Sequence, residues 1–230
     1  MGQQYGPKIV TDGLVLHWDA ANIRSYPGSG TTVYDLSGNG KNGTLSGGTA
    51  YDTDGGGSFY FDGVNDLISF GVGSDLFPLY NFSVDVWFSS DGTTATTGTS
   101  PALFGLTYGL RLFVNSDRLW VGVDNGTSIE SFLGPTGYSF HDSSWHNVVA
   151  TGNNGTIDMY IDGNAVMTSS ISSWSGNTRW PTNSINFGRD NNNTMYYFRG
   201  NMAPIKIYNT KLTQSQITQN FNAIRGRFGI

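Results

Sequence analysis

The sequence has no cysteine, few charged side chains and no long apolar run. The absence of cysteine excludes disulfides, thiolate metal sites and cysteine nucleophiles. Charged residues make up 13% of the 230 residues, and 17 acidic residues outweigh 12 basic ones without any basic cluster. We therefore expect no binding to nucleic-acid phosphates or to anionic lipid surfaces. No stretch approaches the ~18 apolar residues of a membrane span, and residues 1–8 lack the pattern of a secretory signal.

Glycine and aromatic residues are abundant, with 32 glycines and 14% aromatics. Apolar residues recur with a period of two in the segments 82–88, 108–114, 119–123 and 157–161, which is typical of strands with one buried face. Asn-Gly and Asp-Gly pairs stand between such segments and favour tight hairpin turns. The pattern predicts an all-β fold, an antiparallel sandwich of two sheets.

One helix is expected, at the end of the chain. Thr213 and Gln216 form a capping-box pattern, and apolar residues recur at helical spacing from Ile217 onward. We expect a short helix over 213–226. Because no linker or repeat divides the chain, we expect an N-terminal arm over 1–12 and a single domain over 13–230 that includes this helix.

Several motifs resemble the concanavalin A-like lectin/glucanase superfamily, specifically its laminin G-like jelly-roll branch. They include the segments 13–19, 35–45, 59–66, 145–148, 160–163 and 205–209, and their order and spacing extend over about residues 13–223. The resemblance implies a two-sheet jelly roll. It also implies carbohydrate binding as a function class.

A narrower resemblance concerns residues 25–32 in combination with the Asp35 turn, and the closing segment 220–230. Together they look like structural proteins of tailed bacteriophages. This resemblance implies a virion component, either a head decoration protein or a tail-fibre part, assembled in the host cytoplasm. Its partners are then other virion proteins or copies of the chain itself. The alternative is a soluble carbohydrate-binding lectin outside any virus.

Catalytic constellations are lacking. Glucanases of the resembled superfamily use two carboxylates, and glycosidic cleavage requires them about 5–9.5 Å apart. Glu130 is the only glutamate and has no acidic neighbour, while Asp62 and Asp66 lie in a turn-rich segment where short acids serve backbone hydrogen bonds. We expect a non-enzymatic protein, with a glycoside hydrolase as the weaker alternative.

Calcium is the one cofactor that the sequence suggests. Asp35, Ser37, Asn39 and Asn42 offer oxygen ligands on a glycine-rich turn. Jelly-roll lectins often carry such a structural ion, so the resemblance favours the idea, and the segment 190–194 is a poorer second candidate. The alternative is that these side chains only cap turns through hydrogen bonds.

Aromatic and polar residues gather between 172 and 197. Sugar sites combine an aromatic platform with side chains that bind hydroxyl groups. The candidate carbohydrate- or partner-binding residues are Trp174, Arg179, Trp180, Arg189, Tyr196 and Tyr197. Trp87, Trp120 and Trp145 lie in alternating strands and are expected to pack in the core or between facing sheets.

Overall fold

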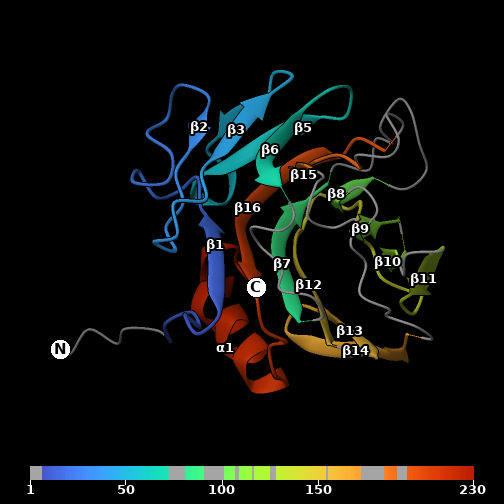
Figure 1. Cartoon of the computed structure of the whole chain (residues 1–230). Helices are drawn as coiled ribbons and strands as arrows, with labels where there is room; N and C mark the ends of the chain where they lie inside the picture. Colours follow the sequence, from blue (N-terminus) through green and yellow to red (C-terminus); the bar gives the residue numbers. More distant parts are fainter. Residues whose placement is uncertain are drawn as a thin grey trace.

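The computed structural model describes residues 7–72, 81–90, 101–106, 109–115, 117–124, 128–153, 155–171, 184–190 and 196–230. Within these ranges the strands form two antiparallel sheets that face each other, with one α-helix beside them (Figure 1). The predicted all-β, two-sheet jelly-roll sandwich with one short C-terminal helix is confirmed.

Each sheet contains eight strands, and sequence neighbours are often not spatial neighbours. The first sheet has the order β14 (Asn164–Ser170), β13 (Thr156–Ile161), β12 (Trp145–Asn153), β7 (Phe82–Ser89), β16 (Arg199–Tyr208), β5 (Ser58–Asp62) and β4 (Ala50–Asp52), with β1 (Leu14–Trp18) paired to β16. The second sheet has the order β11 (Ile129–Leu133), β10 (Leu119–Asp124), β9 (Leu110–Val114), β8 (Ala102–Leu106), β15 (Ser184–Phe187), β6 (Leu67–Val72), β3 (Gly43–Ser46) and β2 (Thr32–Val33).

The main core lies between the two sheets. Alternate residues of facing strands point inward and form one large cluster, to which Val84 and Val148 of the first sheet and Leu112 and Val121 of the second belong. This alternation follows from the period of two in extended chains.

The helix α1 (Gln214–Ile224) lies on the outer side of the first sheet. The Thr213 side chain accepts a hydrogen bond from the Gln216 backbone amide, and the Gln216 side chain accepts one from the Thr213 amide, so the predicted capping box is present. Ile217 packs on Val149 and Tyr208. After α1 the chain makes a 3₁₀ turn over Arg225–Arg227; a second 3₁₀ turn covers Asp54–Gly56.

The segment after α1 packs on the first sheet through ring contacts and an ion pair. Phe228 lies against Trp87 and Trp145, with ring centroids 4.5 and 4.4 Å away. The Arg227 guanidinium forms an ion pair with Asp19 at 2.7 Å. Trp87 and Trp145 therefore pack under the C-terminal segment and not between the two sheets.

Strand β7 departs from the sequence prediction, which gave it a single buried face. All eight of its residues are buried, because α1 and the C-terminal segment cover the face that the prediction left open. Asp85 lies on that face, 3.0 Å from Lys206 Nζ. Asn147 Nδ2 and Asn220 Nδ2 donate hydrogen bonds to the Asp85 carboxylate at 2.8 and 3.3 Å. A buried polar network thus joins β7, β12, β16 and α1.

Part of the predicted N-terminal arm packs on this network. The Val10 amide donates to Asn220 Oδ1 at 2.8 Å, and the Tyr208 hydroxyl donates to the Val10 carbonyl at 3.1 Å. Gln219 Nε2 donates to the Lys8 carbonyl at 2.7 Å. Lys8–Val10 therefore lie against α1, while residues 1–6 fall outside the described residues.

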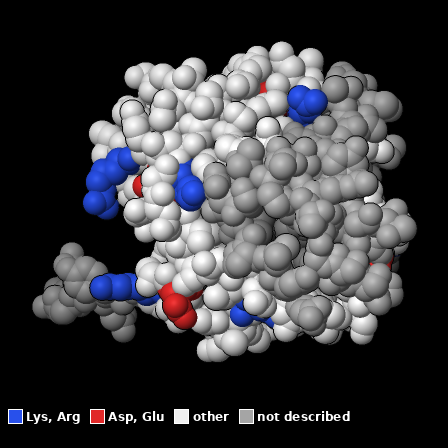
Figure 2. All heavy atoms as spheres, in the orientation of Figure 1, with Lys and Arg blue, Asp and Glu red and all other residues white. Residues whose placement is uncertain are grey.

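On the face shown in Figure 2, the described Lys and Arg side chains lie apart from one another and form no basic patch. In the part of the chain that the structure describes, no helix has the length and hydropathy needed to cross a membrane.

His17 gives a first prediction, a dependence of stability on pH. His17 pairs with Lys206 in the β1–β16 register. Burial, and after it the Lys206 charge, lower the pKa of His17 from 6.5 to about 4. Below pH 6.5 the unfolded chain binds a proton on His17, whereas the native state binds it only near pH 4. The native state therefore loses stability as the pH falls from 6.5 toward 4.

His17→Gln is expected to remove this loss, which amounts to about 2–3 kcal/mol between pH 7.5 and pH 4.5. Urea unfolding of both proteins at the two pH values measures it. Because all other titrating groups are common to both chains, the difference between the two pH dependences isolates His17. Equal pH dependence in both proteins would contradict the prediction.

Candidate ligand-binding face

The candidate site lies on the outer face of the second sheet, over β8, β9 and β10. Leu110, Leu112 and Val114 point into the core. Because side chains alternate along a strand, Arg111 and Phe113 of β9 project from the opposite face. We call this surface the outer face; its other members are introduced below.

Three aromatic side chains gather on the outer face. Trp120 of β10 pairs with Phe113 in the register, and their ring centroids lie 4.2 Å apart. Tyr196 meets the Phe113 ring edge to face at 5.6 Å. A hydrogen bond from the Ala102 amide to the Tyr196 carbonyl at 3.2 Å places Tyr196 beside β8. Phe113 is buried at the centre, while Trp120 and Tyr196 are half-buried on either side.

An ion pair lies next to these rings. Arg111 Nε is 3.6 Å from Asp190 Oδ1, and the two side chains are only 8% and 1% exposed. The register places Gly105 and Gly122 on either side of Arg111, so no cross-strand side chain flanks it. Within the part of the chain that the structure describes, Arg111 Nε and Nη2 find no hydrogen-bond acceptor. The guanidinium therefore retains donor groups that these residues do not use.

Arg189 and Tyr197 extend the group. They form an isolated antiparallel bridge, and the Arg189 guanidinium lies 5.4 Å from the centroid of the Tyr197 ring. Arginine over a tyrosine ring is a favourable cation–π arrangement. Arg189 is adjacent in sequence to Asp190, and Tyr197 to Tyr196, so the backbone of this pair lies beside the two contacts described above.

Of the six binding residues predicted from sequence, Arg189, Tyr196 and Tyr197 come together here. Trp174, Arg179 and Trp180 lie outside the described residues. Sequence reasoning missed Arg111 and Phe113 and expected Trp120 to pack in the core or against a facing sheet. Arg111 is a charged residue inside an otherwise apolar strand, and that signal could have identified it.

The predicted calcium ligands form a closed turn. Asp35 Oδ1 accepts from the amides of His17 and Ser37, both at 2.9 Å. Asp35 Oδ2 accepts from Ser37 Oγ at 2.6 Å and from the Lys41 amide at 3.1 Å.

The other two predicted ligands also take part in hydrogen bonds. Asn42 Oδ1 accepts from the Asp35 amide at 3.0 Å, and Asn39 Nδ2 donates to the Leu14 carbonyl at 3.1 Å. These bonds fit the turn-capping alternative. Calcium at Asp35, Ser37, Asn39 and Asn42 stays a prediction. In the second candidate segment, residues 191–194 lie outside the described residues.

Asp62 and Asp66 are bound to the backbone of their own turn. Asp66 Oδ2 accepts from the Asp62 amide at 2.8 Å, and Asp62 Oδ1 accepts from the Val64 amide at 2.8 Å. Burial, partly offset by the backbone hydrogen bond, raises the pKa of Asp66. These bonds are what the turn-rich sequence led us to expect for short acids.

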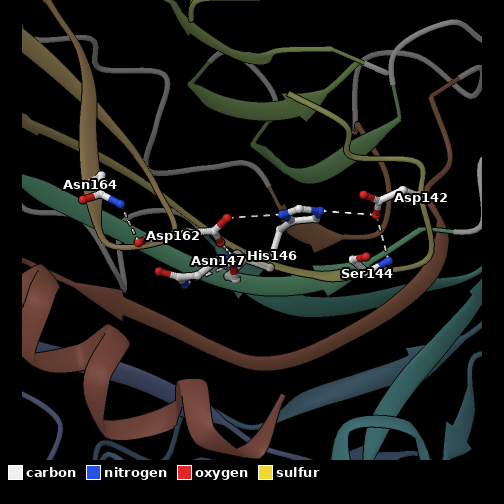
Figure 3. A network of polar contacts seen from close by, with 7 residues as sticks. Asp142, Ser144, His146, Asn147, Asp162 and Asn164 are labelled. Carbon is white, nitrogen blue, oxygen red and sulfur yellow. Dashed lines mark hydrogen bonds and ion pairs between the residues drawn. The ribbon is translucent and has the colours of Figure 1, made fainter. Parts of the chain in front are cut away.

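A second polar cluster lies at the start of β12, where His146 stands between two carboxylates (Figure 3). His146 Nδ1 is 3.3 Å from Asp162 Oδ2, and Nε2 is 3.5 Å from Asp142 Oδ1. The ring also packs on Phe88 and Phe140. Burial lowers the pKa of His146, but the two aspartates outweigh burial and raise it above its ordinary value. The described residues contain no group of three or more His, Cys, Asp or Glu side chains placed to hold a metal ion.

Residues 61–218 match the family model of the concanavalin A-like lectin/glucanase superfamily. The chain belongs to this superfamily. The resemblance seen in the sequence is thereby confirmed at the level of the superfamily. No curated protein matches the sequence.

Solved structures agree with this assignment. The binding domain of Paraclostridial Mosquitocidal Protein 1 has a TM-score of 0.72 and 17% identity, covering 93% of this chain and 52% of that one. Domain 4 of AbnA, an extracellular arabinanase of Geobacillus stearothermophilus solved with arabinotriose, has a TM-score of 0.67 and 20% identity, covering 91% and 98%. The receptor-binding domain of botulinum neurotoxin type G has a TM-score of 0.67 and 15% identity, covering 91% and 51%. The chain thus spans about half the length of the two toxin domains. At sequence identities of 15–20%, these similarities show a shared fold.

Proposed function

We propose that this superfamily member is a non-enzymatic glycan-binding domain whose ligand lies on the outer face of the second sheet. The observation that carries the proposal is the aromatic group Phe113, Trp120 and Tyr196 beside the Arg111–Asp190 pair. Aromatic rings pack against the apolar face of a sugar, and a few convergent polar groups fix its hydroxyls. Two of the structural neighbours are binding domains by name, and a third was solved with a bound arabinose trisaccharide.

The test is a glycan array followed by titration of the best ligand. Trp120→Ala is expected to weaken binding about 5- to 30-fold, since a lost stacking contact costs on the order of 1–2 kcal/mol. Tyr34→Ala, which removes an exposed aromatic ring on β2's side of the molecule, is the matched control and should bind normally. Normal binding by a folded Trp120→Ala protein, or no binding to any glycan, would refute the proposal. Release of shorter sugars from the ligand would refute its non-enzymatic part.

The second proposal concerns location: the domain is a structural component of a bacteriophage particle, in head decoration or a tail fibre. It is supported by the resemblance of residues 25–32 and 220–230 to phage structural proteins. In the first of these segments the Tyr26 ring packs on Tyr51 and Phe59. In the second, Arg227 forms an ion pair with Asp19. The partners of the domain would be other virion proteins or further copies of this chain.

Mass spectrometry and cryo-electron microscopy of purified particles test this location. The protein is expected at a defined position on the particle. Glycan binding by a protein absent from washed particles would instead support the alternative, a soluble lectin outside any virus.

A further inference from the structure

A hollow of about 420 Å³ lies between α1 and the turn that joins β13 to β14. We call it the helix hollow; its polar lining residues are Asp162, Asn164, Gln214, Thr218, Asn222 and Arg225. Gln214, Thr218 and Asn222 are spaced at i, i+4 and i+8 along one face of α1, and Arg225 follows directly after the helix. The volume is within the range of small-molecule sites. The hollow lies on the outer side of the first sheet and shares no residue with the outer face of the second.

The walls of the helix hollow are held in place. Gln214 Nε2 donates hydrogen bonds to the Gly163 carbonyl at 2.8 Å and to Thr218 Oγ1 at 3.0 Å, which ties the helix to the turn. At the base, the Phe221 ring stacks on Trp87 with centroids 5.5 Å apart and planes 7° apart. Gly163 packs so closely on Phe221 that a Cβ there would lie 2.9 Å from the ring. The site is therefore formed before a ligand binds.

The two charged residues that line the hollow are Asp162 and Arg225, and of these only the Asp162 side chain is held by other described residues. The Asp162 carboxylate accepts a hydrogen bond from the Asn147 amide at 2.8 Å and lies 3.3 Å from His146 Nδ1, so it points toward the sheet (Figure 3). Arg225 is exposed, lies 5.9 Å from the Phe221 ring centroid and forms no ion pair with any residue in the described ranges. Asn222 adds an exposed amide one helical turn before Arg225.

We infer that the helix hollow binds a sugar unit that carries a carboxylate, with the carboxylate on Arg225 and hydroxyl groups on Asn164, Thr218 and Asn222. The guanidinium fork matches a carboxylate with two parallel hydrogen bonds. Asparagine amides and the threonine hydroxyl both donate and accept, as sugar hydroxyls require. This second site does not depend on the one proposed above.

The test is a titration of the whole chain with D-glucuronate, followed by amide NMR shifts of residues 162–165 and 214–225. D-Glucose, which lacks the carboxylate, is expected to bind at least ~10-fold more weakly. Arg225→Gln should weaken glucuronate binding by a similar factor. Arg24→Gln, a change at another exposed arginine, is the matched control and should leave it unchanged.

Each other outcome overturns the inference. If Arg225 only stabilises the C-terminal end of α1, then Arg225→Gln lowers the melting temperature and leaves glucuronate affinity unchanged. If sodium acetate shifts the same amides with equal affinity, the hollow selects charge and not an acidic sugar. Should Arg225→Gln fail to fold, Asn222→Ala takes its place and must weaken binding. Trp120→Ala should bind glucuronate normally, so failure of the outer-face proposal is distinguishable from failure here.

Discussion

Asp85→Ala is expected to lower the free energy of unfolding by about 3–5 kcal/mol, a large fraction of the stability of a domain. Asp85 and Lys206 are 1% and 0% exposed, and Asp85 Oδ2 is 3.0 Å from Lys206 Nζ. Without the carboxylate, the ammonium group stays buried with no countercharge. The amide nitrogens of Asn147 and Asn220 also each lose one of their hydrogen-bond acceptors. Chemical denaturation followed by tryptophan fluorescence measures the change.

Two further variants test whether the loss of stability in Asp85→Ala comes from the unpaired Lys206 charge. Asp85→Asn combined with Lys206→Met is expected to be more stable than Asp85→Ala, because it removes both charges and keeps the volume and one amide acceptor. Asp117→Ala breaks the partly exposed Arg118–Asp117 pair, whose side chains are 31% and 45% exposed. This change should cost no more than about 1 kcal/mol. If Asp85→Ala and Asp117→Ala lower the free energy of unfolding by similar amounts, the buried ion pair contributes no more to stability than the partly exposed one.

Gly200→Ala is expected to destabilise the fold by more than about 3 kcal/mol, since backbone strain and a steric clash add together. Gly200 lies in β16 with φ +134°, and a Cβ there would lie 2.1 Å from the Ser89 carbonyl oxygen of β7. The backbone of an inner strand cannot move aside without breaking the pairing of β7 and β16.

Gly30→Ala is the matched control for this change. Gly30 has φ +86° but an added Cβ there meets nothing within 4 Å, so only the cost of a left-handed residue remains, about 1–2 kcal/mol. Thermal and urea unfolding of both variants give the comparison. Equal costs at the two positions would mean that the close approach to Ser89 is relaxed easily.

Local features of the fold could be predicted from the sequence, whereas pairings between distant segments could not. The capping box of Thr213 and Gln216 involves four consecutive residues, and it is present as predicted. The alternation of residues 82–88 correctly indicated a strand. It did not indicate that Asp85 is buried, or that Trp87 packs under the C-terminal segment and not between the sheets. The residues that cover both side chains lie in α1 and the C-terminal segment, more than 120 positions later in the chain.

The candidate site shows the same division. Composition alone made Arg189, Tyr196 and Tyr197 candidates, and their role in binding stays a prediction. The local pattern around Asp35 correctly indicated a turn closed by hydrogen bonds. The contribution of Trp120 depends on its register with Phe113 across β9 and β10. The alternation of residues 119–123 predicts that Trp120 and Val121 point to opposite faces of their sheet. It does not predict which of these two faces lies against the other sheet.

The position of β7 between β12 and β16 has a consequence for biosynthesis. When residues 82–89 leave the ribosome, neither of the strands that flank them has been made. The helix that shields Trp87 follows more than 120 residues later. Topologies with such distant pairings fold slowly, and their apolar surface stays exposed and prone to aggregation until folding is complete. Recombinant yield should therefore depend on translation speed, growth temperature and chaperone supply.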